Sequence, residues 1–572
     1  MNIPWRVRIL LGPMRPFVVR KVRDALRERF LVRMLRRQLP THVHEGRSLR
    51  TGVTPLPSAS WFAAHSSDVL AFASSMRMGV VGAYGIGHWR VGDPDPTGVD
   101  TRSVHELSRM HHWCAYALAA HIDREHRDEW CDLLFDEIST FMRTTPAEHG
   151  IHWQFPMGTG IRLHSMLVAW DWARRSGWEH AEGEHRVAAY AVDHARSVVA
   201  RRESRGGLST SHYAANLLGI RAAGIYLVGE PAAAHWSDLA ANELSKELYR
   251  QILPDGMANE GSTGYHRQVT DLFVQAAALG AFSPDELTKI GGAVERCRNL
   301  EQHGMPLIGD NDDGLAMKLT GFTPDLDYLY DVGTRMCGSA DVGDEDLVAP
   351  DLGLTIRRSG SMITSLRNGP VGQFGKGGHA HNDQNSITVS IGGEPFVVDP
   401  GTSCYTSDPI QRDIERSVHQ HATMWSVSSE QAFMPPGEEG MFWLLDDELE
   451  TEVVANTGSV WHGIVSAQDG RRHERHVALG EDHLSVRDVY TPTAKDPMAE
   501  WVLPLGEGVE VELDANKAIL RGRKTSALLI WDNGSMMVDR SMISPCFAET
   551  RVALCLRIRT NALSWTLSNF AA

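Results

Sequence analysis

Apolar residues recur at helical spacing between about residues 60 and 335. They occupy positions i, i+3 and i+4, as at Leu163, Met166, Leu167 and Trp170, and this spacing is typical of helices with one apolar face. Glycine and proline residues interrupt the pattern between segments. The pattern predicts helices over His105–Ala120, Asp128–Arg143, Gly160–Arg175, His185–Arg201, Tyr213–Val228, Ala233–Ile252 and Gln268–Leu279. Successive helices of this length favour an α/α bundle or toroid.

Near Val342–Pro350 the pattern changes to short alternating segments, which indicate strands with one buried face. It predicts strands over Leu354–Arg357, Met362–Arg367, Ser386–Ile391, Phe396–Val398, Gly463–Ala467, Arg475–Leu479, Leu484–Tyr490, Ala499–Leu505, Val509–Leu513, Lys517–Arg521, Ala527–Trp531 and Arg551–Thr560. We therefore expect an α+β protein of two domains. An N-terminal arm (1–45) precedes a helical domain (46–345) and an antiparallel β-sandwich (346–572).

Charge is distributed unevenly in this acidic chain. The formal net charge of the 572 residues is −16, yet residues 1–40 hold eleven Lys and Arg side chains. Apolar residues over Val18–Leu39 follow helical spacing, so this basic arm is suited to an acidic surface, either a membrane or a partner. The alternative is a solvated helix that packs against the rest of the protein. The acidic remainder argues against a nucleic acid partner.

Cysteine usage and the first residues both indicate a cytoplasmic protein. The seven cysteines are scattered and contain no CxxC pair, which favours reduced thiols. Pro4, Pro13 and Pro16 interrupt any apolar core of a secretory signal. We expect a cytoplasmic location, with the arm as the segment available for peripheral membrane contact.

The segment GGHAHND contains two histidines, His379 and His381. On an extended segment, side chains two residues apart point to the same side. The following alternating run and the Gly392–Gly393 turn predict a hairpin that carries Asp399 back toward the histidines. Two imidazoles and a carboxylate are suited either to metal ligation or to acid–base chemistry.

A further histidine, His421, follows this hairpin in the segment RSVHQHAT. His381, Asp399 and His421 together would form a set of two nitrogen ligands and one oxygen ligand, with water as the fourth ligand of a zinc ion. The alternative is a hydrogen-bonded cluster without a metal.

The helical part holds two further groups of polar residues. Ser209 and Thr210 are expected to cap the helix that contains His212, which lies in its first turn. A glycine-rich loop enters a later helix at Tyr265, His266 and Arg267. The segment 309–314 is rich in carboxylates, but it lacks the twelve-residue ligand pattern of an EF-hand.

Four stretches together resemble the heparinase II/III-like polysaccharide lyases: STSHYAANLLG, QILPDGMANEGSTGYHR, GGHAHNDQNS…FVVDPGT and RSVHQHAT. The resemblance implies an incomplete (α/α) toroid followed by an antiparallel β-sandwich. It also implies β-elimination at a uronic acid, in which C5 loses a proton and the 4-O-glycosidic bond breaks. The implied substrate is an acidic polysaccharide or oligosaccharide, such as a glycosaminoglycan or alginate.

The resemblance also implies roles for individual residues. Tyr265 corresponds to the principal acid and base, while His212 and His379 share proton transfer and neutralisation of the substrate carboxylate. Ser211, His266 and Arg267 stand at substrate-binding positions. His381, Asp399 and His421 stand at the positions that hold a mainly structural zinc ion.

Two positions depart from the family pattern. Ser211 stands where the family commonly has an Asn that helps to neutralise the substrate carboxylate, and a hydroxyl donates only one hydrogen bond. Ala422 replaces another common Asn. A non-catalytic or biosynthetic glycan-binding protein of surface polysaccharide assembly is therefore an alternative. A hydrolase that uses the metal set directly is a third hypothesis.

Overall fold

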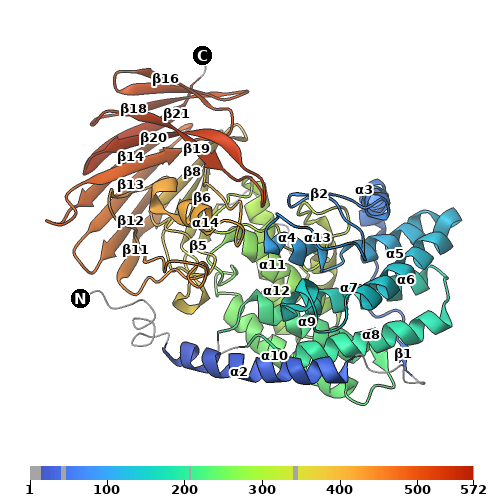
Figure 1. The fold of residues 1–572 in the computed structure, drawn as a ribbon. Helices are drawn as coiled ribbons and strands as arrows, with labels where there is room; N and C mark the ends of the chain where they lie inside the picture. Colours follow the sequence, from blue (N-terminus) through green and yellow to red (C-terminus); the bar gives the residue numbers. More distant parts are fainter. Residues whose placement is uncertain (1–14, 40–46, 205–207, 339–345, 571–572) are drawn as a thin grey trace. The chain divides into compact units, whose positions relative to one another are not determined.

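The computed structural model describes residues 15–39, 47–204, 208–338 and 346–570, and Figure 1 labels many of its elements. Its α-helices are α2 (Arg15–Gln38), α3 (Ala59–Arg77), α4 (Thr101–Leu107), α5 (His112–Ile122), α6 (Arg127–Thr144), α7 (Pro156–Arg175), α8 (Ala181–Ala200), α9 (Ser211–Tyr226), α10 (Ala233–Gln251), α11 (Thr263–Ala278), α12 (Pro284–Gln302), α13 (Asp327–Cys337) and α14 (Pro409–Arg416).

Most strands follow the helices in the chain. Four short ones lie among the helices: β1 (Ser48–Leu49), β2 (Val80–Ala83), β3 (Ile86–His88) and β4 (Leu227–Val228). The others are β5 (Leu347–Ala349), β6 (Leu354–Ser359), β7 (Met362–Arg367), β8 (Ser386–Ile391), β9 (Glu394–Val397), β10 (Met424–Ser426), β11 (Leu449–Thr457), β12 (Val460–Ala467), β13 (Arg472–Gly480), β14 (His483–Thr491), β15 (Ala499–Pro504), β16 (Glu510–Asp514), β17 (Lys517–Arg521), β18 (Ser526–Trp531), β19 (Met537–Ile543), β20 (Arg551–Arg559) and β21 (Ala562–Asn569).

The chain forms two compact units, which we call the helical unit and the β unit. The helical unit comprises Met1–Ile252, Arg267–Val294 and Asp313–Ala340, and the β unit comprises Leu253–His266, Glu295–Asp312 and Asp341–Ala572. Two segments of the β unit, Leu253–His266 and Glu295–Asp312, lie within the range 46–345 that the sequence assigned to the helical domain. Both segments belong to the β unit because their backbones bond its loops: Gln373 N donates to Asn259 O, and Asp310 N donates to His379 O.

Inner and outer helices of the helical unit differ in their burial. Every residue of α5 from His112 to Ala120 is buried, and α7 is buried from Pro156 to Ala173, as expected of helices enclosed on all sides. The outer helices α6, α8 and α10 are buried on one side only and contact α5, α7 and α9 respectively. This paired arrangement, with the sheets that follow it, confirms the fold class expected from the sequence.

The close contact between α7 and α9 depends on two glycines. A Cβ atom on Gly219 would lie 2.6 Å from the carbonyl oxygen of Gly160, and one on Gly160 would lie 2.5 Å from the carbonyl oxygen of Ala215. Real Cβ atoms do not approach other atoms so closely, so glycine is needed at both positions. This contact fixes α9, which carries His212 at its N-terminal end.

Helix α2 packs against the rest of the helical unit through the part whose side chains are described. Leu35 and Leu39 join a buried cluster with Ala147 and Trp153. Arg36 Nε also donates a hydrogen bond to the carbonyl oxygen of residue 148. These contacts favour the packed-helix interpretation for the C-terminal part of the arm. Residues 1–14 and 40–46 lie outside the described residues, and membrane contact by the arm stays a prediction.

None of the helices in the described ranges is long and apolar enough to cross a membrane.

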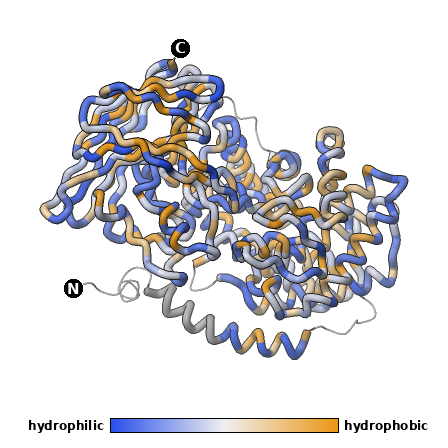
Figure 2. The backbone as a smooth tube through the Cα atoms, turned by 45° about the horizontal axis from the view of Figure 1, so that its top comes forward, coloured by the Kyte–Doolittle hydropathy of each residue, from blue (hydrophilic) through white to orange (hydrophobic). Residues whose placement is uncertain are grey.

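Antiparallel sheets form most of the β unit. The sheet orders are β5-β6-β7-β8-β9, β10-β15-β20-β19 and β11-β12-β13-β14-β21-β18-β17-β16. Hydrophilic and hydrophobic positions alternate along many of these strands (Figure 2), and one buried cluster takes apolar side chains from all three sheets. The hairpin expected at Gly392–Gly393 is confirmed, since Ile391 pairs with Glu394 and both glycines have positive φ.

Candidate functional site

Tyr265 and His379 stack against each other in the β unit. Tyr265 lies in the first turn of α11, where its backbone N donates to Ser262 Oγ at 3.1 Å. His379 comes from the loop between β7 and β8. The ring centroids are 3.6 Å apart and the planes are inclined by 17°. Two residues far apart in the sequence thus share one site.

The Tyr265 hydroxyl is part of a chain of hydrogen bonds. It donates to Asp312 Oδ2 at 2.9 Å and lies 3.1 Å from the Tyr405 hydroxyl. A phenol has one proton, so Tyr405 donates to the Tyr265 oxygen. Burial, with the nearby charge of Asp310, raises the pKa of Tyr405 well above its usual value and keeps it a donor. This arrangement gives the Tyr265 oxygen a donor on one side and its proton a carboxylate acceptor on the other.

Asp310 connects His379 with the predicted metal ligands. Its Oδ2 lies 3.0 Å from His379 Nδ1, its Oδ1 lies 3.0 Å from His381 Nε2, and Thr402 Oγ1 donates to Oδ1 at 3.3 Å. Arg412 completes the set with two hydrogen bonds of 2.9 and 2.8 Å. Burial alone would raise the pKa of Asp310, but Arg412 and both histidines hold this pKa well below its usual value.

Arg412 is held on the inner side of α14. Its side chain is fully buried, its Nε donates to Met441 O at 3.0 Å, and its guanidinium lies 4.6 Å from the ring centroid of Tyr405. Burial would lower the pKa of Arg412, but Asp310 raises it. A fully charged guanidinium therefore fixes Asp310 and one face of Tyr405.

The structure brings His381, Asp399 and His421 together. His421 Nε2 lies 3.2 Å from His381 Nδ1 and 3.5 Å from Asp399 Oδ2. The ligand atoms of all three residues lie within 4.8 Å of one another, and all three residues are buried.

The other nitrogens of the two histidines fix their tautomers. His381 Nε2 faces Asp310 Oδ1, and His421 Nδ1 lies 2.9 Å from Ser417 O. Both partners are acceptors only, so these nitrogens carry the protons. Two nitrogen lone pairs then face each other beside a carboxylate, and a cation between them would satisfy all three groups. The residues therefore fit a zinc ion.

In the helical unit, His212 is held by a backbone cap and by the side chain of Glu203. Thr210 Oγ1 accepts a hydrogen bond from the His212 backbone N at 3.3 Å, as expected of a cap. His212 Nδ1 lies 3.0 Å from Glu203 Oε1, and Asn216 Nδ2 donates to Glu203 Oε2 at 3.1 Å. The His212 side chain is 38% exposed, so it is accessible to a ligand.

The three predicted substrate-binding residues are all buried. Ser211 is 0% exposed, His266 is 0% exposed and accepts a hydrogen bond from Ala258 N through Nδ1, and Arg267 is 7% exposed and lies 3.7 Å from Asp313 Oδ1. Ser211 offers no surface to a substrate without a rearrangement of α9. Substrate binding by these residues stays a prediction.

The structure predicts the effect of Ser211→Asn, the substitution toward the family pattern. The larger side chain has no space at a fully buried position, so we expect it to lower the free energy of unfolding by about 1–3 kcal/mol. Urea denaturation checks this value, with Ser67→Asn at an exposed position of α3 as the matched control. A variant as stable as its parent would show that this part of α9 can rearrange.

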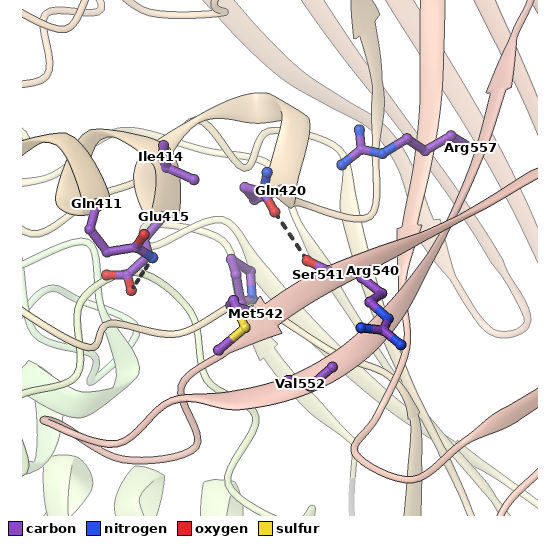
Figure 3. Close-up of a pocket in the computed structure, with 10 residues that line it drawn as sticks. Gln411, Ile414, Glu415, Gln420, Arg540, Ser541, Met542, Val552 and Arg557 are labelled. Carbon is purple, nitrogen blue, oxygen red and sulfur yellow. Dashed lines mark hydrogen bonds between the residues drawn. The ribbon is translucent and has the colours of Figure 1, made fainter.

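A pocket of about 260 Å³ lies between α14 and β19 in the β unit. Figure 3 shows Gln411 beside Glu415 on the helix, and Gln420 facing Ser541 of the strand. Ser541 Oγ donates to Gln420 Oε1 at 3.2 Å. The lining residues do not include Tyr265 or His379, so this pocket is separate from their stacked rings.

Asp310, Arg412 and Tyr405 belong to the site, although the sequence did not predict a role for these three residues. Asp310 lies in the carboxylate-rich segment 309–314, and Arg412 precedes the RSVHQHAT stretch. These positions are 102 residues apart in the chain. The run of acidic residues and an arginine close to a family motif were the available signals, but they did not indicate the pairing.

Comparisons with known proteins match both parts of the chain. A family model described as "Heparinase II/III N-terminus" matches residues 88–286, and one described as "Heparinase II/III-like, C-terminal" matches residues 342–564. No curated protein matches the chain.

Several solved structures are similar to this one. A heparinase III structure has a TM-score of 0.68 and 14% identity, and the match covers 94% of this chain and 89% of that chain. A mutant of a heparan sulfate lyase from Pedobacter heparinus has a TM-score of 0.59 and 14% identity, and covers 96% and 89%. Another heparinase III has a TM-score of 0.61 and 12% identity, and covers 88% and 84%. At these identities the likeness shows the fold alone.

Proposed function

We propose, since the chain belongs to the heparinase II/III-like family, that it is a lyase which cleaves an acidic polysaccharide or oligosaccharide by β-elimination at a uronic acid. The observation that carries this proposal is the pairing of Tyr265 and His379 with one chain of hydrogen bonds. One of the similar structures is a heparan sulfate lyase, so sulfated glycosaminoglycans belong among the substrates tested, together with alginate.

The hydrogen-bond chain is suited to the proton transfers of this reaction. A base must remove the C5 proton and an acid must protonate the leaving oxygen. The Tyr405 hydroxyl stabilises a negative charge on the Tyr265 oxygen, because it donates to that oxygen. In the resting arrangement Asp312 accepts a hydrogen bond from the Tyr265 hydroxyl. Tyr265 is thus placed to give up a proton and to take one back.

His379 is proposed to act on the substrate carboxylate. Its Nδ1 donates to Asp310, which fixes the ring plane against Tyr265, and its Nε2 lies at the opposite edge, 3.8 Å from Glu260 Oε2. With a proton on Nε2 as well as on Nδ1, the ring would donate to the substrate carboxylate. This neutralisation makes the C5 proton more acidic, since the enolate-like state then carries less charge. His212 stays a predicted participant in proton transfer and in neutralisation of the substrate carboxylate. His212→Ala should therefore lower turnover, and kcat measurements test this.

His381, Asp399 and His421 would hold a zinc ion with a mainly structural role. When bound, zinc would neutralise Asp399 and fix the rings of both histidines. The side chains of His381 and His421 are 0% exposed and that of Asp399 is 2% exposed. A water-activating metal needs a coordination position that substrate can reach, so this burial favours the structural role over the hydrolase hypothesis.

Zinc removal is expected to reduce stability more than turnover. A chelator should lower the unfolding temperature, while kcat measured below both transitions should change only a few-fold. Zinc content, thermal denaturation and turnover, measured on the same samples before and after zinc is restored, check this. Reversible loss of all turnover at an unchanged unfolding temperature would favour the metal-dependent hydrolase instead.

A non-catalytic glycan-binding protein is the second candidate, and the burial of Ser211 favours it. It predicts binding of the same polysaccharides with no change in their length. Size analysis of the polysaccharide after incubation therefore separates the two functions.

A further inference from the structure

A second group of histidines lies on the eight-stranded sheet, away from the residues described above. His462 on β12 is the direct cross-strand partner of His476 on β13, and Ile464 is the partner of Glu474. Side chains two residues apart on a strand share a face, so His476 and Glu474 point to the same side as His462. The three side chains therefore gather on one face of the sheet.

These three residues offer ligand atoms close to one another. The two imidazole rings are stacked with centroids 3.8 Å apart, and His462 Nε2 lies 3.5 Å from Glu474 Oε2. One ligand atom from each residue lies within 4.8 Å of the others. Two ligand atoms of one zinc ion lie at most about 4 Å apart. Small rotations of the rings would therefore bring the three ligand atoms within coordination distance of one ion.

The position of His462 in the group suits a cation. His462 Nε2 is buried and makes no hydrogen bond. A nitrogen in this state, next to a carboxylate, is an unsatisfied group that a metal ion would satisfy.

Glu474 is oriented toward the histidines by a neighbour. Arg472 Nη2 lies 3.3 Å from Glu474 Oε1, which leaves Oε2 on the side of His462. The side chains of His462 and Glu474 are 15% and 27% exposed. The group is thus ordered but open to water, which supplies the remaining ligand of a tetrahedral ion.

We propose that His462, Glu474 and His476 form a second binding site, for a divalent cation of the zinc type, which joins β12 to β13 on the open face of the sheet. Two imidazoles and one carboxylate are the ligand types that such cations prefer. The site is independent of the proposed lyase reaction and of the buried zinc set.

Zinc titration of the full chain, first stripped with a chelator, tests this site. We expect two zinc ions per chain in the parent protein. Asp399→Asn should remove the buried ion only, and His476→Gln should weaken the other about tenfold or more. His483→Gln, at an exposed position of β14, is the matched control and should leave both ions bound.

The readout does not depend on enzymatic activity, so it stands even if the chain proves not to be a lyase. His462→Gln should reproduce the effect of His476→Gln, with an unfolding temperature equal to that of the parent in the absence of zinc. A single ion per chain that Asp399→Asn abolishes would overturn the proposal, as would full zinc binding in both His→Gln variants.

Discussion

Tyr265→Phe is expected to lower kcat for polysaccharide cleavage by about 10²–10⁴-fold, the range that one general acid or base supplies. Phenylalanine keeps the ring that stacks on His379 at 3.6 Å. It removes the hydroxyl that bonds Asp312 and Tyr405. The loss therefore falls on proton transfer rather than on packing, and KM should change much less than kcat.

The control for this prediction is another tyrosine. Tyr249 lies on α10 and is 60% exposed, so Tyr249→Phe should leave kcat and KM unchanged. Initial rates over a range of substrate concentrations, together with thermal denaturation of all three proteins, provide the comparison. A Tyr265→Phe variant with the kcat of the parent would remove Tyr265 from the reaction.

Asp310→Asn is expected to have the largest effect on stability. Arg412 is fully buried and makes both of its bidentate hydrogen bonds to Asp310. Removing one partner of a buried ion pair leaves an uncompensated charge, which costs about 3–5 kcal/mol. The neutral amide is also a weaker acceptor for His381 Nε2 than the carboxylate, so zinc binding should weaken, because that bond fixes the ring as a ligand.

An exposed ion pair provides the control. Asp346 lies 2.7 Å from Arg357 and is partly exposed to solvent, so Asp346→Asn should cost less than about 1 kcal/mol. Urea unfolding and zinc content check both variants. Arg412→Lys keeps the charge but loses the bidentate geometry, and it gives a second measurement if Asp310→Asn does not fold. Equal stabilities of the two Asp→Asn variants would contradict the central position of Asp310.

The stability that Asp310 contributes to the folded protein should decrease as the pH is lowered. Its folded-state pKa is lowered, with Arg412 as the main cause that opposes burial. The contribution is therefore complete above the unfolded value of about 3.9 and is lost as pH falls through the lowered folded value. Acid unfolding of the parent should thus begin below about pH 4, and this step should be absent in Asp310→Asn.

Local patterns predicted most of the elements whose burial alternates or repeats regularly. The predicted strands Met362–Arg367, Ser386–Ile391 and Lys517–Arg521 agree with β7, β8 and β17 at both ends. Strand β19 was missed because most of its side chains are exposed and show no alternation. Strand β21 was missed although apolar and polar residues alternate from Leu563 to Ser568 and its burial alternates with them, so a strand signal was present there.

One predicted helix was wrong for a backbone reason. His105–Ala120 contains neither glycine nor proline, so the sequence contained no sign of an interruption, yet α4 ends at Leu107 and α5 begins at His112. Met110 has φ of 54° between them. When a residue other than glycine or asparagine adopts the left-handed backbone conformation, the sequence gives no signal of it. The other predicted helices agree with the structure to within a few residues at most ends.

The site divides in a similar way into local and long-range parts. The stretch GGHAHND and its hairpin indicated His379, His381 and Asp399 because their spacing is local. The pairing of Asp310 with Arg412 joins a loop to a helix 102 residues away. Periodicity holds no information about such a contact, so the residue that connects the two histidines emerged only from the fold.

The chemistry of the cleavage product separates β-elimination from hydrolysis and from binding alone. Purified protein is incubated with heparan sulfate, chondroitin, hyaluronan and alginate, and the products are analysed by ultraviolet absorbance and mass spectrometry. A lyase leaves an unsaturated uronic acid at the new non-reducing end, so we expect each product that carries this end to be lighter by one water than the corresponding hydrolysis product. Products of hydrolytic mass without that absorbance, or intact polysaccharide bound to the protein, would contradict the proposed function.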